Sequence, residues 1–176
     1  MTALQVSISS PLPDLAELWQ RAPLICTEEL GVAMDEAVLL LEREVIELTP
    51  RGATSTLRNQ ITSLRLAPTP LETGDVIGLV TGTAPHTVAV EMGTRPHPVP
   101  IAPLLDWVKA KLGLDGKEGR QVAFAISRKI AKHGTKGVAM FRRAMEVNNN
   151  GARVERILQA AVPRITARLT GAGHEQ

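Results

Sequence analysis

The sequence predicts an α+β fold in which a long N-terminal helix packs on a small antiparallel sheet of three to four strands, with additional C-terminal helices. Three observations support this prediction: helical spacing of apolar residues before residue 50, short alternating runs between residues 57 and 92, and renewed helical spacing after residue 101. With 176 residues, of which 44% are hydrophobic and 22% charged, the chain is long enough for one domain with a hydrophobic core. We predict a single domain, 1–176. Its expected parts are an N-terminal arm (1–12), a helix-plus-sheet core (13–95), a helical insertion (96–137), C-terminal helices (138–169) and a tail (170–176).

Residues 13–48 have the spacing of a helix with one buried face. Pro23 is expected to break or kink it, which gives a short helix over 14–21 and a longer one that ends at Thr49-Pro50. The apolar residues that recur at three- and four-residue steps are Leu30, Met34, Val38, Leu41, Val45 and Leu48. A second apolar stripe at seven-residue spacing predicts contacts on two sides of this helix. It consists of Val32, Leu39 and Ile46.

Three strands are predicted after a small polar loop at 51–56. They cover residues 57–66, 75–83 and 87–92, where apolar residues are mixed or alternate with polar ones. The connections between them are short and rich in Pro, Gly and Thr, so an antiparallel meander is the expected topology.

Helical spacing returns in the second half of the chain. Helices are predicted over 102–112, 118–132, 138–147 and 151–169. Pro163 is expected to bend the last of them.

Composition and motifs argue against an enzyme. A single cysteine, Cys26, excludes an internal disulfide and a multi-cysteine zinc cluster. The histidines His86, His97 and His133 lack the spacing of a metal-binding helix, and no phosphate loop or nucleophile motif is present. We therefore expect no catalytic residue, no metal and no cofactor. The sequence also shows no secretion signal and no apolar run long enough to cross a membrane.

Charge is distributed unevenly along the chain. Residues 1–50 carry nine Asp or Glu against two Arg, whereas residues 101–176 carry fourteen Lys or Arg against six acidic residues. One hypothesis is that these segments meet, inside one fold or between neighbouring subunits; the other is that the basic segment faces a polyanion such as DNA. The first is preferred because a pure DNA binder rarely has so acidic a half. The basic candidates for a DNA contact are Lys129, Lys132, Arg142, Arg143, Arg153, Arg156, Arg164 and Arg168.

One stretch carries a recognisable motif. The segment 84–97 contains Val90-Glu-Met-Gly-Thr94, preceded by His86-Thr87, and the upstream segment 48–61 contains a proline followed by Thr54-Ser-Thr-Leu-Arg58. These segments resemble the neck and tail-component family of tailed bacteriophages, in which a Val-Glu-x-Gly-Thr strand follows a Thr-Gly-x-Leu segment. Met140-Phe-Arg-Arg-Ala144 is similar to the helix that follows in shorter members, so this chain resembles a longer member with a helical insertion.

The resemblance implies a structural protein of the virion, assembled in the host cytoplasm and located at the neck or the top of the tail. It implies a homo-oligomeric ring, expected to hold six copies, with other connector and tail proteins as partners and a non-specific genome contact for the basic residues. The alternatives are a tail terminator that caps the tail tube and, more distantly, a cytoplasmic DNA-associated protein. Opposed charges suggest that the acidic helix of one subunit faces the basic region of its neighbour. The expected interface residues are Arg51, Thr54, Leu57, Arg58, Glu91, Thr94 and Arg95.

Overall fold

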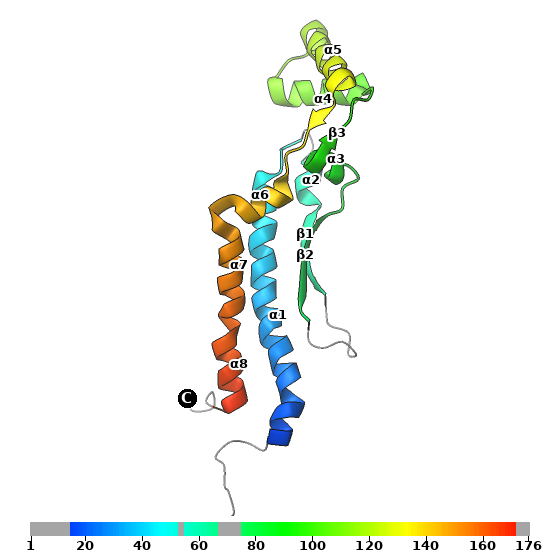
Figure 1. The fold of residues 1–176 in the computed structure, drawn as a ribbon. Helices are drawn as coiled ribbons and strands as arrows, with labels where there is room; N and C mark the ends of the chain where they lie inside the picture. The colour runs from blue at the N-terminus through cyan, green and yellow to red at the C-terminus, as the bar shows by residue number, and fades with distance from the viewer. Residues whose placement is uncertain (1–14, 53–54, 67–74, 172–176) are drawn as a thin grey trace, which may run out of the picture. The chain divides into compact units, whose positions relative to one another are not determined.

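The computed structural model has an α+β fold and describes residues 15–52, 55–66 and 75–171 (Figure 1). Its contacts divide the chain into two compact units. Unit 1 comprises Met1–Ala37, Arg65–Gly78 and Arg153–Gln176. Unit 2 comprises Val38–Leu64 and Leu79–Ala152. The first helix and the first two strands each contribute residues to both units.

Helices dominate the described residues. They are α1 (Leu15–Leu48), α2 (Thr56–Asn59), α3 (Thr87–Met92), α4 (Ile101–Leu112), α5 (Gly116–His133), α6 (Met140–Glu146), the short 3-10 turn η1 (Val147–Asn149), α7 (Asn150–Gln159) and α8 (Ala161–Thr170). The helices predicted over 102–112, 118–132 and 138–147 are confirmed as α4, α5 and α6, with ends that differ by one or two residues.

The long N-terminal helix α1 is continuous and contains Pro23. The predicted break at this proline is wrong. Proline removes one backbone hydrogen bond and costs about 3 kcal/mol inside a helix. Ile25, two residues further on, is buried, and so are Ala33 and Ala37. Burial of this face offsets the lost hydrogen bond, because tertiary packing supplies most of the stability of helices in proteins.

The helix packs on a two-stranded antiparallel sheet of β1 (Ile61–Leu66) and β2 (Ile77–Gly82). β2 confirms the strand predicted over 75–83, whereas β1 is shorter than predicted because residues 56–59 form α2. Alternate residues of β1 face α1: Ile61 is buried, and the backbone N–H of Ser63 donates to the Glu42 carboxylate at 3.0 Å.

The single sheet of three to four strands is wrong, because the described residues form two separate two-stranded sheets. The third predicted strand, 87–92, is the helix α3. The last carbonyl groups of α3 accept hydrogen bonds from a distant segment: Val138 N donates to Val90 O at 2.8 Å, and Ala139 N donates to Glu91 O at 3.0 Å. These long-range bonds override the strand propensity of a Val-rich segment.

The insertion consists of α4 and α5, which pack on each other (Figure 1). A two-stranded antiparallel ribbon of β3 (Gly93–Thr94) and β4 (Thr135–Lys136) connects it to the rest of unit 2. Gly134 lies beside this ribbon with φ +70°, and a Cβ there would collide with the carbonyl oxygen of Thr94. Glycine is therefore required for the close approach of the two chains.

The predicted last helix, 151–169, is divided into α7 and α8. The interruption is at Ala160, three residues before Pro163. Pro163 lies in the first turn of α8, where a backbone N–H has no partner within the helix, so its absence costs little there. The same absence means that Pro163 cannot donate the backbone hydrogen bond that would continue α7. Ala160 keeps right-handed helical backbone angles, and its N–H donates to Arg156 O at 3.0 Å, so only this one residue interrupts the helical stretch.

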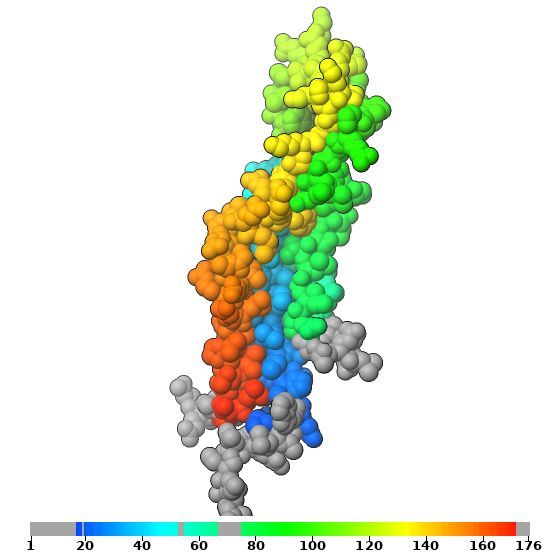
Figure 2. Space-filling model, viewed as in Figure 1, coloured from blue at the N-terminus to red at the C-terminus, as the bar shows by residue number. Residues whose placement is uncertain are grey.

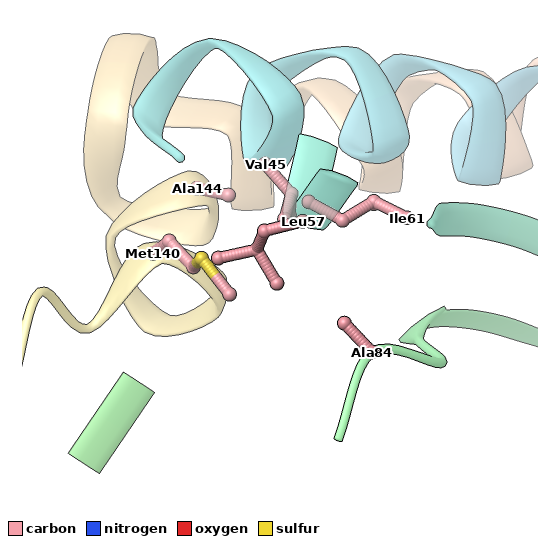
Figure 3. Packing of buried hydrophobic residues seen from close by; sticks show 6 residues of the cluster. All are labelled: Val45, Leu57, Ile61, Ala84, Met140 and Ala144. Atoms are coloured by element: carbon pink, nitrogen blue, oxygen red, sulfur yellow. The ribbon is translucent and has the colours of Figure 1, made fainter. Parts of the chain in front are cut away.

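The hydrophobic core of unit 2 joins residues far apart in the sequence. Figure 3 shows Met140 of α6 pointing toward Leu57 of α2, beside Val45 of α1. Met140 is 0% exposed, and its sulfur lies 3.2 Å from the hydroxyl of Thr49, which also donates to Val45 O at 2.6 Å. The remaining buried members of this cluster are Ile61, Ala84 and Ala144.

Candidate functional site

Four of the seven predicted interface residues are engaged within the chain: Leu57, Arg58, Glu91 and Thr94. Leu57 is 6% exposed and belongs to the core of unit 2, so it offers little surface for a contact with another subunit. Glu91 is half-buried, and its carboxylate accepts hydrogen bonds from Phe141 N at 3.1 Å and Arg142 N at 3.4 Å. It caps the first turn of α6, where the free backbone N–H groups need acceptors. Thr54 lies outside the described residues.

Thr94 and Arg95 lie at the start of the ribbon that carries the insertion. The hydroxyl groups of Thr94 and Thr135 are 2.9 Å apart, and each also accepts a hydrogen bond from the other residue's backbone N–H at 3.1 Å. Thr94 therefore stabilises the ribbon. Arg95 is exposed and stays available for an external contact.

Arg51 and Arg58 line an open pocket of unit 2 at the end of α1. Nε of Arg58 donates to the carbonyl oxygen of Ile46 at 2.9 Å, so this side chain caps the C-terminal end of α1. Arg51 is exposed. The pocket also contains the side chain of Glu42, which already accepts a hydrogen bond from Ser63.

The helix α3 presents two exposed apolar side chains that the sequence analysis did not single out. Val88 is 72% and Met92 is 77% exposed, the two highest values among the large hydrophobic residues that the structure describes. Residues four apart share one face of a helix. Val90 lies on the other side and packs against the core. The helix α3 therefore has an apolar face with no partner among the described residues.

The second apolar stripe of α1 is largely uncovered. Val32 is 62% and Leu39 is 60% exposed, whereas Ile46 packs against the core of unit 2. In the described part of this single chain, Ile46 is thus the only residue of the second stripe that packs against other residues as predicted.

Acidic and basic residues meet inside unit 1. Arg164 of α8 donates to the carboxylate of Glu29 at 2.9 Å, and Arg168 reaches both Glu29, at 3.0 Å, and Glu28, at 2.8 Å. Figure 2 shows α8 lying directly against the first half of α1. The hydrogen bonds that Arg164 and Arg168 donate lower the pKa of Glu29, and the bonds that Arg168 donates to Glu28 and Glu29 raise the pKa of Arg168.

These pairs bear on two predictions. Arg164 and Arg168, two of the candidates for a DNA contact, bind carboxylates of the same chain. For these residues the acidic and basic segments meet inside one fold, which is one of the two arrangements expected if the segments meet.

The Glu29 pairs predict a dependence of stability on pH. The pKa of Glu29 is lower in the folded state than its ordinary value of 4.5. The ionised carboxylate therefore stabilises the fold at pH values above 4.5, and this stabilisation is lost as the pH falls through the lowered pKa. We expect Glu29→Gln to lower the free energy of unfolding slightly at pH 7 and to have less effect at pH 3. Urea unfolding at both pH values measures this, and an equal loss at both would contradict it.

The other basic candidates lie in different environments. Arg142 forms an exposed pair with Glu146 at 3.9 Å, and Arg143 is exposed. Arg153 and Arg156 already have interactions within the chain. Lys129 and Lys132 are exposed on α5.

The helix α5 carries exposed basic residues that have no ion-pair partner among the described residues. Its buried residues Gly119 and Ala123 lie on the side that packs on α4. Five exposed residues share the opposite side of the helix, and we call this surface the α5 basic face. It consists of Lys117, Arg120, Phe124, Arg128 and Lys132.

Among the described residues, no group of three His, Cys, Asp or Glu side chains could hold a metal ion. None of the described helices is long and apolar enough to cross a membrane. The chain matches no protein-family model, no curated protein and no solved structure.

Proposed function

We propose that this protein is a structural component of a tailed-phage virion that forms a ring of six copies at the head-to-tail junction. It acts through contacts between subunits and with neighbouring connector and tail proteins, without catalysis. The tail terminator is an alternative position for the same kind of ring.

The observation that carries the proposal is the exposed apolar face of α3. Val88 and Met92 lie in the segment that contains Val90-Glu-Met-Gly-Thr94, the motif that resembles the neck and tail-component family. Large apolar side chains that are more than 70% exposed are candidates for burial in an assembly. Arg95 follows directly and is exposed. It adds a charge at the edge of the apolar face, as is common at the rim of protein interfaces.

A ring requires that one surface of a subunit fits a different surface of the next. The exposed second stripe of α1, Val32 and Leu39, provides another apolar surface on this chain. Glu28 and Glu29 of the acidic segment already pair with Arg164 and Arg168 of the basic segment within one chain. We therefore propose that apolar contacts, and not the opposed charges of the two chain ends, hold the subunits together.

The test is the assembly state of a double variant, Val88→Ser/Met92→Ser. Complete burial of one such side chain contributes about 1.5–3 kcal/mol, so removal of both is expected to weaken subunit association on the order of 100-fold. Native mass spectrometry and electron microscopy of the purified protein measure the change, and circular dichroism checks that the fold is retained.

A matched control removes two exposed apolar residues elsewhere. Leu112 of α4 is 49% and Val162 of α8 is 57% exposed, and Leu112→Ser/Val162→Ser is expected to leave assembly unchanged. Cross-linking of purified virions then locates the chain. Absence of the chain from the neck and tail top, or equal assembly of wild type and the α3 variant, would count against the proposal.

A further inference from the structure

The α5 basic face is built as an outward surface of the insertion. α5 has 18 residues and is about 27 Å long. Lys117, Arg120, Arg128 and Lys132 distribute four positive charges along most of that length, with Phe124 between the two arginines. Lys117, Arg120, Phe124 and Arg128 line an open groove together with Gln121 and Ala125.

The four cations of this face have no ion-pair partner among the residues that the structure describes. Residues 96–137 carry eight Lys or Arg and three Asp or Glu. One of these acids, Asp115, is already bound to Lys109 of α4 at 2.9 Å. The hydrogen bonds between these two groups lower the pKa of Asp115 and raise that of Lys109. The insertion thus has a positive charge that it does not neutralise itself.

A second copy of the chain offers little to neutralise it. The acidic residues of α1 are largely used within their own chain: Glu28 and Glu29 pair with α8, Asp35 pairs with Arg65 at 2.9 Å, and Glu42 binds Ser63. Glu17 and Glu47 pair with arginines one helical turn away. Because most carboxylates of α1 already have partners, a second copy has few free acids to offer, and exposed ones such as Glu36 and Glu118 are scattered. This favours a counter-charge from a different, more highly charged molecule.

We infer that the α5 basic face binds the phosphate backbone of double-stranded DNA without sequence specificity. Duplex DNA carries one negative charge per about 1.7 Å of its axis, so a helix with four free cations spread along most of its length meets several phosphates. The arginines are suited to phosphate because their planar guanidinium groups donate two parallel hydrogen bonds. This inference does not depend on the proposed function, because it rests only on the charges of the described residues and on which of them are paired within the chain.

The experiment measures binding of the full chain to a fluorescent 30-base-pair duplex of random sequence by anisotropy, between 50 and 200 mM NaCl. Arg120→Gln/Arg128→Gln is expected to weaken binding at least 10-fold at 50 mM NaCl. The slope of log K against log salt is expected to become shallower by about 1.8, since each phosphate contact contributes about 0.9.

A matched control changes the charge by the same amount elsewhere. Arg21 and Arg43 are exposed on α1 and pair with Glu17 and Glu47, so Arg21→Gln/Arg43→Gln is expected to leave DNA affinity within twofold of wild type. Circular dichroism verifies the fold of both variants. No wild-type binding at 50 mM NaCl, or the same loss in both variants, overturns the inference.

Measurement of the oligomer mass in the same samples separates the two proposals. Loss of DNA binding by Arg120→Gln/Arg128→Gln with an unchanged oligomer supports the DNA contact alone. If this variant keeps its DNA affinity but fails to assemble, the α5 basic face is a protein interface and the DNA inference is wrong. If the wild-type protein is a monomer and binds DNA with the expected salt slope, the DNA inference stands and the proposal of a ring is wrong.

Discussion

Met140→Ala is expected to lower the free energy of unfolding by about 2–5 kcal/mol, a large part of the stability of a typical domain. Met140 is 0% exposed and lies in the cluster that joins α1, α2 and α6 (Figure 3). Alanine removes its thioether and leaves a cavity that the surrounding side chains fill only in part. The hydroxyl of Thr49 loses its contact with the sulfur but keeps its hydrogen bond to Val45 O.

The same helix offers a control for this change. Met145 of α6 is 45% exposed, so Met145→Ala alters the helix propensity of α6 in the same way but leaves no cavity. We expect its effect to stay within about 0.5 kcal/mol of wild type. Chemical unfolding followed by circular dichroism measures both variants. Equal stability of the two variants would show that α6 does not pack in the core as described.

The elements that the sequence predicted well depend on local pattern. α1, α4 and α5 have long apolar periodicity, and their ends coincide with Pro50, Gly113 and Gly134. Such signals act within a few residues, so they can be recognised without knowledge of the tertiary structure. The error at Pro23 has a different origin. The cost of a proline is local, whereas the burial that offsets it depends on packing that the pattern alone does not show.

The segment 87–92 shows why the candidate interface was only partly predicted. As a strand, Val88, Val90 and Met92 would share one face, and all three would be expected in the core. As the helix α3, Val90 turns toward the core while Val88 and Met92 point away from it. The helix is fixed by backbone bonds from Val138 and Ala139, which lie almost fifty residues further along the chain. No feature of the segment itself reveals those bonds.

The charge pattern indicated that the two ends of the chain attract each other, but it did not indicate which residues meet. The sequence showed that an acidic first segment and a basic last segment are electrostatic complements, and the structure brings parts of them together through Glu29 and Arg164. Which arginines are used this way could not be predicted, because the four candidates all lie in one predicted helix, 151–169. They are Arg153, Arg156, Arg164 and Arg168. A signal for the α5 basic face was present, since Lys117, Phe124 and Arg128 lie opposite the small residues Gly119 and Ala123.

Gly134→Ala is expected to lower the free energy of unfolding by about 3 kcal/mol or more and to open the β3–β4 ribbon. Gly134 has φ +70° and ψ −160°, a conformation that is essentially restricted to glycine and costs other residues about 1–3 kcal/mol. An added Cβ would also collide with the carbonyl oxygen of Thr94, which is backbone and cannot rotate away. Urea unfolding measures the loss, and faster hydrogen exchange at the amides of Thr94 and Thr135 reports that the ribbon has opened.

A variant at Gly113 distinguishes the cost of the backbone conformation from the cost of the collision at Gly134. It has φ +67° and ψ 11°, and a Cβ there would meet nothing within 4 Å. Gly113→Ala is therefore expected to cost only about 1 kcal/mol, the usual penalty of a left-handed residue. A larger loss for Gly134→Ala, together with faster exchange confined to the ribbon, identifies the close approach of the two strands as the attachment of the α4–α5 insertion. Equal losses for the two variants would mean that the ribbon tolerates a side chain, and that the insertion is anchored elsewhere in unit 2.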